Sequence, residues 1–417
     1  MSEARVEPTY VAPQAESAWD LPLEAVNPAQ ASLFQTDSQW SYFDRLRKEA
    51  PVHFCADSDF GPYWSITRYE DIMYVDTHHK IFSSEGGITL ASQDEDFTLP
   101  MFIAMDPPKH DVQRNTVSGV VAPRNLSQLE PIIRERAGKI LDELPRDETF
   151  DWVDRVSIEL TTQMLATLFD FPFEDRRKLT RWSDVATAGP DSGIVDSEEQ
   201  RRAELIECLE YFTELWNQRV NKAPGNDLVS MLAHGESTKN MSPMEYLGNL
   251  VLLIVGGNDT TRNSISGGLL ALNQFPGEYE KLKANTGLIP NMVAEIIRWQ
   301  TPLAHMRRRA LEDVELHGQT IRKGDKVAMW YVSGNRDEAV WERPNDLIID
   351  RKDARKHVAF GYGIHRCMGN RLAEMQLRIV WEEIMKRFKH VEVMAEPKRN
   401  HSSFVKGYLE LPVRIHS

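Results

Sequence analysis

Residues 360–388, FGYGIHRCMGNRLAEMQLRIVWEEIMKRF, place a single cysteine between a glycine-rich loop and an amphipathic helix. Gly361 and Gly363 precede Cys367, and Gly369 follows it. Beyond Gly369, apolar side chains recur every three or four positions, which predicts a helix with one buried face. Glycine lets a backbone approach a ligand closely, and free amides at a helix start favour a thiolate. The stretch therefore predicts that Cys367 faces a bound group.

Four interpretations of Cys367 are open from these residues alone. A buried structural cysteine is the usual state of a lone thiol. A zinc site would need three more ligands, and the sequence has no Cys-x-x-Cys motif to supply them. A nucleophilic cysteine is conceivable because His365 is two residues away. A thiolate that ligates haem iron accounts best for the glycine-rich loop.

Phe360, Gly363, Cys367 and Gly369 follow the order Phe-x-x-Gly-x-x-x-Cys-x-Gly, which resembles the haem-binding loop of the cytochrome P450 monooxygenases. The resemblance covers about residues 40–415. It implies a mainly α fold with a smaller β component, in which haem b lies between a long central helix and the helix after the cysteine. It also implies that Cys367 is the axial ligand of the haem iron.

Residues 252–270, LLIVGGNDTTRNSISGGLL, interrupt the most apolar helix of the chain with polar side chains. Ser242 and Pro243 are a typical N-cap and first residue for this helix, and Pro276 is expected to stop it. An unpaired polar group costs about 1–3 kcal/mol to bury. The interruption in the middle of a core-crossing helix therefore indicates a functional site.

Asp259 and Thr260, inside this interruption, resemble the acid–alcohol pair of the P450 family. The resemblance assigns Thr260 to hydrogen-bond dioxygen and Asp259 to gate protons. We expect Gly256 and Gly257 to let oxygen and substrate approach the helix backbone. The sequence assigns no role to three neighbouring residues, Asn258, Thr261 and Arg262.

Glu295 and Arg298 are three residues apart in AEIIRWQ and share one face of a predicted helix. Such pairs are common on exposed helices, and the chain contains others. Their position, about 70 residues before the cysteine loop, resembles that of the Glu-x-x-Arg pair of the family. The resemblance implies a structural ion network that is buried behind the haem, with Arg351 as its third member.

Cations for the two haem propionates are expected at several places. His110 and Arg114 follow a Pro-Pro turn at positions i and i+4, although a solvated basic face would look the same. The resemblance adds Arg308, from HMRRRALEDVEL, and His365. It thus implies these cofactor-binding residues: His110, Arg114, Gly256, Arg308, Phe360, Gly361, His365, Cys367 and Gly369.

Charge is unevenly distributed along the chain. The formal net charge is −14, which argues against nucleic acid and anionic membranes as partners. Residues 351–378 instead contain seven Lys or Arg against two Asp or Glu, as a solvated face or a docking surface would. The sequence shows no flavin or nicotinamide domain. The resemblance therefore implies that this segment docks an acidic 2Fe–2S ferredoxin, itself reduced by an NAD(P)H-dependent ferredoxin reductase.

The rest of the chain indicates one large domain. Residues 52–67 predict a hairpin, residues 197–220 a long helix, and the stretches ALEDVELHGQTI and KVAMWYVS after residue 305 predict strands. Three cysteines in 417 residues indicate a reducing compartment, and no run of about 18 apolar residues could span a bilayer. We expect a loose N-terminal arm over residues 1–40 and a cytoplasmic, monomeric catalytic domain over residues 41–417.

At finer grain, GGNDTTRNS and HMRRRALEDVEL resemble the bacterial terminal hydroxylases of cytochrome P450 family 153. This resemblance implies that O₂ oxidises the terminal methyl group of a medium-length alkane, alkyl compound or fatty acid. A peroxide-driven peroxygenase is an alternative that would not need the Asp259–Thr260 pair, and a haem-thiolate sensor is another. Candidate pocket residues, for which plain core packing is the alternative, are Leu253, Val255, Leu303, Ala304 and Met306.

Overall fold

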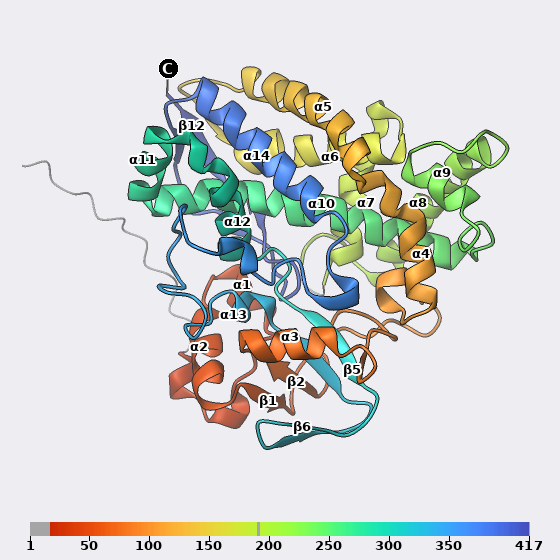
Figure 1. Cartoon of the computed structure of the whole chain (residues 1–417), viewed down its shortest axis with the longest axis vertical. Helices are drawn as coiled ribbons and strands as arrows, with labels where there is room; N and C mark the ends of the chain where they lie inside the picture. Colours follow the sequence, from red (N-terminus) through yellow and green to blue (C-terminus); the bar gives the residue numbers. More distant parts are fainter. Residues whose placement is uncertain (1–16, 190–191, 417) are drawn as a thin grey trace, which may run out of the picture.

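The computed structural model describes residues 17–189 and 192–416. Helices gather in one part of the molecule, and the largest sheet lies below them with the first helices of the chain (Figure 1). The α-helices are α1 (Ala31–Gln35), α2 (Trp40–Glu49), α3 (Tyr69–Thr77), α4 (Lys109–Ser118), α5 (Pro123–Asp142), α6 (Glu159–Phe169), α7 (Arg177–Thr187), α8 (Glu198–Arg219), α9 (Leu228–His234), α10 (Pro243–Gln274), α11 (Pro276–Ala284), α12 (Ile289–Gln300), α13 (Tyr331–Gly334) and α14 (Asn370–Arg387).

The strands of the described residues form four small sheets, of which the largest has the order β1-β2-β8-β5-β3. In that sheet β2 and β8 are parallel, and the other neighbours are antiparallel. The strands are β1 (Val52–Cys55), β2 (Tyr63–Ile66), β3 (Phe82–Ser83), β4 (Thr149–Asp151), β5 (Met306–Ala310), β6 (Val314–Leu316), β7 (Gln319–Ile321), β8 (Lys326–Met329), β9 (Val391–Val393), β10 (Lys398–Arg399), β11 (Tyr408–Glu410) and β12 (Pro412–Ile415).

The long helix α10 crosses the helical part and has 32 residues, or about 48 Å at 1.5 Å per residue (Figure 1). The Ser242 side chain accepts a hydrogen bond from the amide of Glu245, and Pro243 occupies the first turn. The predicted start and end of this helix are confirmed. Its polar centre stays α-helical throughout, so the polar residues are accommodated by partners on neighbouring helices and not by a break.

The predicted hairpin over residues 52–67 is confirmed as β1 and β2. The strand predicted for KVAMWYVS is wrong in its second half, because α13 begins at Tyr331. Trp330 ends the strand: its amide donates to the Ile66 carbonyl and its indole nitrogen donates to Ser65. These bonds fix the side chain in the core at the point where the chain turns away from the sheet.

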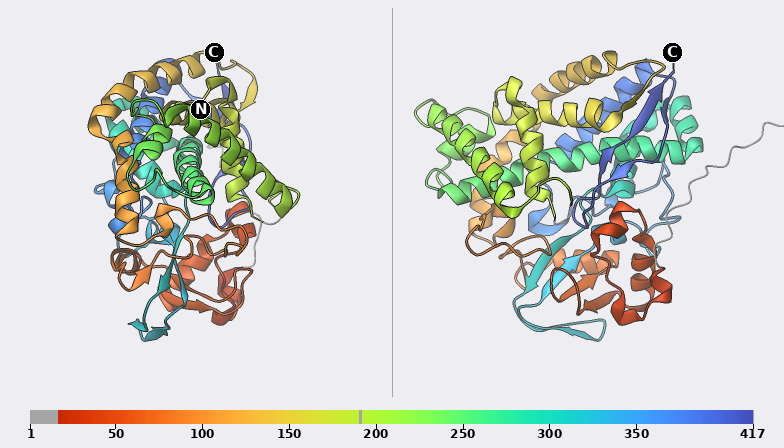
Figure 2. Two further views of the ribbon diagram at one scale, coloured as in Figure 1. Left: turned by 90° about the vertical axis from the view of Figure 1, so that its right-hand side faces the viewer. Right: turned by 180° about the vertical axis from the view of Figure 1, so that it is seen from behind.

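Residues 17–40, which lie within the range expected to form an N-terminal arm, pack closely against the sheet. Ala18, Val26 and Phe34 are buried, and the Phe34 ring stacks on Trp330 with 6.2 Å between centroids. The remainder of the expected arm, residues 1–16, lies outside the described residues. Two further views show the first helices beside the sheet and apart from the main helical layer (Figure 2).

Within the described part of the chain, no helix combines the length and the apolar character that a membrane span requires.

Candidate active site

A cavity of about 1300 Å³ lies between the centre of α10 and the cysteine loop. Gly256 and Thr260 line it from α10, and Phe360, Cys367 and Gly369 line it from the loop. The two stretches that the sequence singled out therefore face each other across one space, although about 100 residues separate them in the chain.

The loop before Cys367 is held in a tight shape that needs its glycines. Gly361 and Gly363 have φ angles of +66° and +67°, and a Cβ on Gly363 would lie only 2.5 Å from the Asp76 carbonyl oxygen. The Cys367 amide donates to the Phe360 carbonyl at 2.8 Å. These contacts fold the loop back on itself and leave the sulfur on the cavity wall.

The environment of Cys367 suits a thiolate that receives a metal. Its side chain is open to the cavity but otherwise surrounded by protein, and this desolvation raises the pKa of the thiol. The amide of Gly369 and the positive charges of Arg114 and Arg366 act in the opposite direction and lower it. A cation bound at the sulfur would remove the remaining cost of ionisation.

The structure gives little support to the other interpretations of Cys367. In the described residues, no group of three or more His, Cys, Asp or Glu side chains is placed to hold a metal ion, so a zinc site has no ligands there. A nucleophilic pair would need a bond between Cys367 and His365. Both ring nitrogens of His365 are instead buried without a hydrogen-bond partner in the part of the chain that the structure describes.

Arg114, Arg308 and His365 line the same cavity, as the sequence predicts for cations that hold haem propionates. His110 does not line the cavity, but its ring contacts that of His365 with 4.3 Å between centroids. The His110 Nε2 atom is also buried without a partner among the described residues. Burial and the nearby Arg308 lower the pKa of His365 to about 2, which an anion beside it would reverse. These unpartnered nitrogens, the two arginines and the thiolate loop together fit a haem.

Asp76, at the end of α3, is a member of this site that the sequence analysis missed. Its carboxylate accepts from Arg308 Nη2 at 2.7 Å, from the Tyr331 hydroxyl at 2.8 Å and from the Tyr362 amide at 2.7 Å. It thus ties the cationic wall to the cysteine loop. The neighbours of Arg308 in the triple-arginine run do not line the cavity, because side chains alternate along β5.

Gly256 and Gly257 have different environments. A Cβ on Gly256 would meet nothing within 4 Å, so this glycine opens the helix surface toward the cavity, as predicted. A Cβ on Gly257 would lie 2.6 Å from Leu165 of α6. Gly257 nevertheless lines the cavity, as does Leu165, so this glycine borders the space and also allows α6 to pack closely. That Gly257 makes room for oxygen or substrate stays a prediction.

Asp259 is fully buried and points toward α7. Its carboxylate lies 3.0 Å from Arg262 Nη2, accepts from Ser183 Oγ at 3.0 Å and from the Asn258 amide at 3.1 Å. Arg262 also binds Asp184 at 2.6 Å. Desolvation raises the pKa of Asp259 although Arg262 opposes the shift. Asn258 and Arg262, to which the sequence assigned no role, thus belong to the surroundings of this acid.

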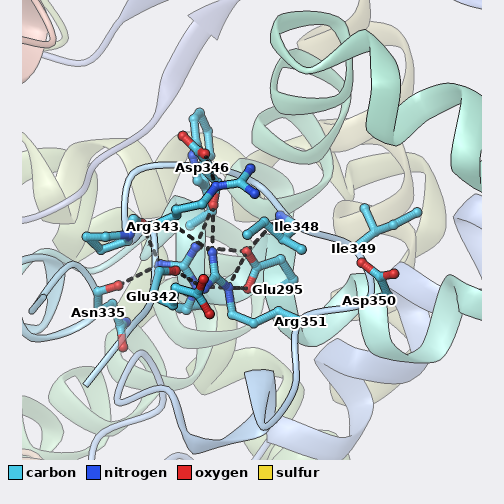
Figure 3. Close-up of polar contacts among 12 residues, drawn as sticks. Glu295, Asn335, Glu342, Arg343, Asp346, Ile348, Ile349, Asp350 and Arg351 are labelled. Carbon is cyan, nitrogen blue, oxygen red and sulfur yellow. Dashed lines mark hydrogen bonds and ion pairs between the residues drawn. The ribbon is translucent and has the colours of Figure 1, made fainter. Parts of the chain in front are cut away.

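Glu295, Arg298 and Arg351 form the buried ion network that the family resemblance implied (Figure 3). Arg298 binds both carboxylate oxygens of Glu295 at 2.8 Å, and Arg351 Nε lies 2.9 and 3.0 Å from the same oxygens. The Ile348 amide donates to this carboxylate, and the remaining guanidinium donors bind backbone carbonyls, including that of Asp346. The network ties α12 to the segment that leads into the cysteine loop.

Most of the expected pocket residues lie on the cavity wall. Leu253, Val255, Leu303 and Met306 line it, whereas Ala304 is buried on the other side of its extended segment, against the cluster that contains Trp330. The assignment of Ala304 to the pocket is therefore corrected. Lining residues without a periodic signal were missed, and they include Phe97, Met101, Phe102, Leu165, His305 and Phe404.

Comparison with known proteins agrees with this geometry. The family model "Cytochrome P450" matches residues 194–413, which is more than half of the chain. The chain belongs to the cytochrome P450 family. Linalool 8-monooxygenase of Pseudomonas putida is 36% identical over 383 residues, which cover 89% of this chain and 94% of that protein. A methyl-branched lipid omega-hydroxylase of Mycobacterium tuberculosis is 31% identical over 386 residues, covering 89% and 90% of the two chains.

Solved structures of cytochrome P450 family 153 are similar throughout. Cytochrome P450-153 from Novosphingobium aromaticivorans is 45% identical, with a TM-score of 0.88 over 94% of this chain and 100% of that chain. CYP153D17 from Sphingomonas sp. PAMC 26605 is 50% identical, with a TM-score of 0.89 over 95% and 100%. The predicted fold class and the resemblance to family 153 are confirmed. The chain is a cytochrome P450 monooxygenase, and its family implies haem as the cofactor.

Proposed function

We propose that this P450 hydroxylates the terminal methyl group of a medium-length alkyl chain. The observation that carries the proposal is the apolar wall of one part of the cavity, formed mainly by side chains from α10, from the segment before β5 and from residues 99–102, which suits a saturated chain. Similarity to family 153 structures at 45–50% identity supports it. Apolar side chains of this wall include Leu99, Met101, Phe102, Val251, Leu253, Val255, Leu303, Met306 and Phe404.

Haem bound through Cys367 supplies the activation of O₂, because an electron-rich thiolate favours O–O cleavage. The residues of the chain control where the substrate and the protons lie. The apolar wall excludes water from the reacting C–H bond, and Gly256 leaves room beside the helix backbone. Arg114, Arg308, His110 and His365 would hold the propionates.

Thr260 and Asp259 are proposed to handle protons in sequence. The Thr260 hydroxyl donates to the Gly256 carbonyl at 3.1 Å, so its oxygen is oriented to accept a hydrogen bond from the cavity side. Asp259 lies on the α7 side of the helix and is held there by Arg262. We infer that Asp259 carries a proton toward Thr260 only when it exchanges its bond to Arg262, and Asp184 then takes over that arginine.

Electrons are proposed to arrive from a 2Fe–2S ferredoxin and its NAD(P)H-dependent reductase. In the basic segment 351–378, fewer cations are available to a partner than its composition indicated, because several form ion pairs within the chain. Arg351 binds Glu295, Arg355 binds Glu374, Lys356 binds Asp353, and Arg378 binds Glu130 and Glu382. Within the described residues, the exposed cations of this segment without an ion pair are Lys352, Arg366 and Arg371.

A ligand titration followed by product analysis tests the proposal. Alkanes, alkanols and fatty acids of equal length are added to the ferric holoenzyme, and the shift of the haem spin state is recorded. Turnover with a ferredoxin and its reductase should then give products that are oxidised at the terminal carbon. Attack at internal carbons only, or no spin-state shift with any alkyl ligand, would overturn the proposal.

We also infer that the chain acts as one catalytic domain in a cytoplasmic monomer, and that this domain includes residues 17–40 as well as the expected range 41–417, because they share a core cluster with the sheet. The free thiols of Cys55 and Cys208 are buried in the core and support a reducing compartment. Light scattering of the holoenzyme at several concentrations tests the monomer.

A further inference from the structure

One part of the cavity wall is polar although the rest is apolar. Two segments build it, His305 in front of β5 and residues 401–403 near the C-terminus. His305 is only 1% exposed, and its ring lies between Trp330 and Phe404, at 4.7 and 5.5 Å between centroids. The imidazole is thus held in one place on the wall, well outside the cysteine loop.

The hydrogen-bonding state of His305 follows from its partner. Its Nδ1 lies 2.9 Å from the Ser403 carbonyl oxygen, which can only accept, so Nδ1 must carry the proton. Burial lowers the pKa of His305 to about 4, so the ring is neutral near pH 7. Nε2 is therefore a bare acceptor, and it is buried without a partner among the described residues. His401, which lines the same wall, also has a buried ring nitrogen, Nδ1, without a partner there.

The charges around the cavity restrict what such an acceptor can bind. Asp59, Asp94, Asp196 and Glu198 line the cavity away from the cysteine loop. Arg202 pairs with Asp94 at 2.7 Å and with Glu198 at 3.5 Å. Arg201 is engaged by Glu198 at 2.9 Å and by the carbonyls of Val185 and Ala186. The other arginines of the lining, Arg114 and Arg308, belong to the haem site. A carboxylate would therefore meet the negative charges of Asp59 and Asp196, which make no ion pair within the described residues, and a bare acceptor at His305.

We propose that the wall at His305 and His401 binds an uncharged hydroxyl group at the far end of the substrate, so that the enzyme prefers alkanols to alkanes and to fatty acids. A hydroxyl can donate to His305 Nε2, which neither a methyl group nor a carboxylate can do. This inference rests on the proposed terminal hydroxylation, because the alcohol end must lie away from the methyl group that reacts. Leaving a buried acceptor unpaired is costly, so a ligand whose hydroxyl group donates to this acceptor should bind with the highest affinity.

Decane, 1-decanol and decanoate, titrated into the ferric holoenzyme, form a matched ligand series. We expect 1-decanol to bind about fivefold to tenfold more tightly than decane, as one net hydrogen bond would give. Decanoate should bind most weakly, and Glu198→Gln, which removes a negative charge from the cavity lining, should improve its binding severalfold at low salt. Equal affinities for decane and 1-decanol, or tightest binding of decanoate, would overturn the inference.

Variants of His305 separate the hydrogen bond from the shape of the wall. His305→Phe should remove the preference for 1-decanol and leave decane affinity within about twofold, whereas His305→Asn, which keeps an acceptor, should retain part of it. Met101→Leu is the control, because Met101 lines the cavity but has no hydrogen bond with His305 in the described part of the chain, so this variant should change the affinities for decane and 1-decanol by the same factor. The red-shifted Soret band of the reduced carbon monoxide complex verifies that each variant holds its haem.

Failure of this inference and failure of the proposed function give different results. If terminal oxidation of decane proceeds but His305→Phe affects decane and 1-decanol equally, then the hydroxyl site is wrong and the proposed function stands. If none of the three ligands shifts the spin state and none is oxidised at its terminal carbon, the proposed function itself is wrong.

Discussion

Two buried ion networks of opposite stoichiometry flank the haem site. Around Glu295, two arginines share one carboxylate, and their remaining donors bind backbone carbonyls (Figure 3). Around Arg262, two carboxylates share one guanidinium, and one of them, Asp184, is 29% exposed. In the first network every guanidinium nitrogen donates at least one hydrogen bond, and the network holds α12 to the segment that leads into the cysteine loop. In the second, two carboxylates contact one cation, and the proposed exchange of partners by Asp259 rests on this arrangement.

Glu295→Gln should have the largest effect, because it leaves two buried guanidinium groups without a countercharge. Removing one partner of a buried ion pair typically costs about 3–5 kcal/mol, so we expect that much loss in the free energy of unfolding, or failure to retain haem. The denaturant midpoint of the holoenzyme measures it. Glu374→Gln is the control. It breaks the pair with Arg355 at the surface and should lower the free energy of unfolding by about 1 kcal/mol or less. Similar losses of stability in the two variants would contradict the conclusion that the Glu295 network is structurally more important than the pair at the surface.

Thr260→Ala should disturb proton delivery while leaving the networks intact. We expect substrate binding and O₂ consumption to persist, while most of the O₂ consumed appears as hydrogen peroxide and not as hydroxylated product. The ratio of product to NAD(P)H consumed measures this coupling. Thr261→Ala, the neighbour on the same helix, is the control and should stay largely coupled. Fully coupled turnover in Thr260→Ala would show that the hydroxyl has no role in proton transfer.

Asp259→Asn tests the pH behaviour of the second network. Burial raises the pKa of Asp259, so in the wild type the folded state holds this proton more tightly than the unfolded state does. The contribution of Asp259 to stability therefore falls as the pH rises from the pKa of an ordinary aspartate, which applies to the unfolded state, to the raised pKa of the folded state. Above the raised pKa this contribution no longer changes with pH. Relative to the wild type, Asp259→Asn should thus gain stability across that window, as unfolding at a series of pH values would show. A difference that is independent of pH would contradict the raised pKa.

Arg371→Glu should have the smallest effect and extends the comparison to exposed charges. We expect reduction by the ferredoxin to slow severalfold at low ionic strength, and the difference to shrink as salt screens the surface. Lys356→Glu is the matched variant, and it should slow reduction less because Asp353 already neutralises Lys356 at 3.1 Å. Reduction rates measured by stopped flow decide the point. Equal reductions in rate in the two variants would show that the ion pair of Lys356 with Asp353 does not influence how the ferredoxin docks.

The sequence was most informative where chemistry requires fixed spacing within one segment. The order of residues around Cys367, the capped helix from Pro243 and the Glu295–Arg298 pair could all be predicted, because each depends on local geometry. Asp76 and His305 could not, because their roles arise from partners more than 90 residues away. Gly257 shows the same limit, since only the position of α6 distinguishes it from Gly256.

The sparse charge of the segment 351–378 has a kinetic consequence. Each hydroxylation consumes two electrons, whereas a 2Fe–2S carrier delivers one at a time. On the proposed docking, a spent carrier must leave and a fresh one must arrive within every catalytic cycle. Four of the seven cations are already paired with neighbours, so on this proposal the three others would steer the encounter but add little to its lifetime. The face is therefore suited to rapid turnover of partners.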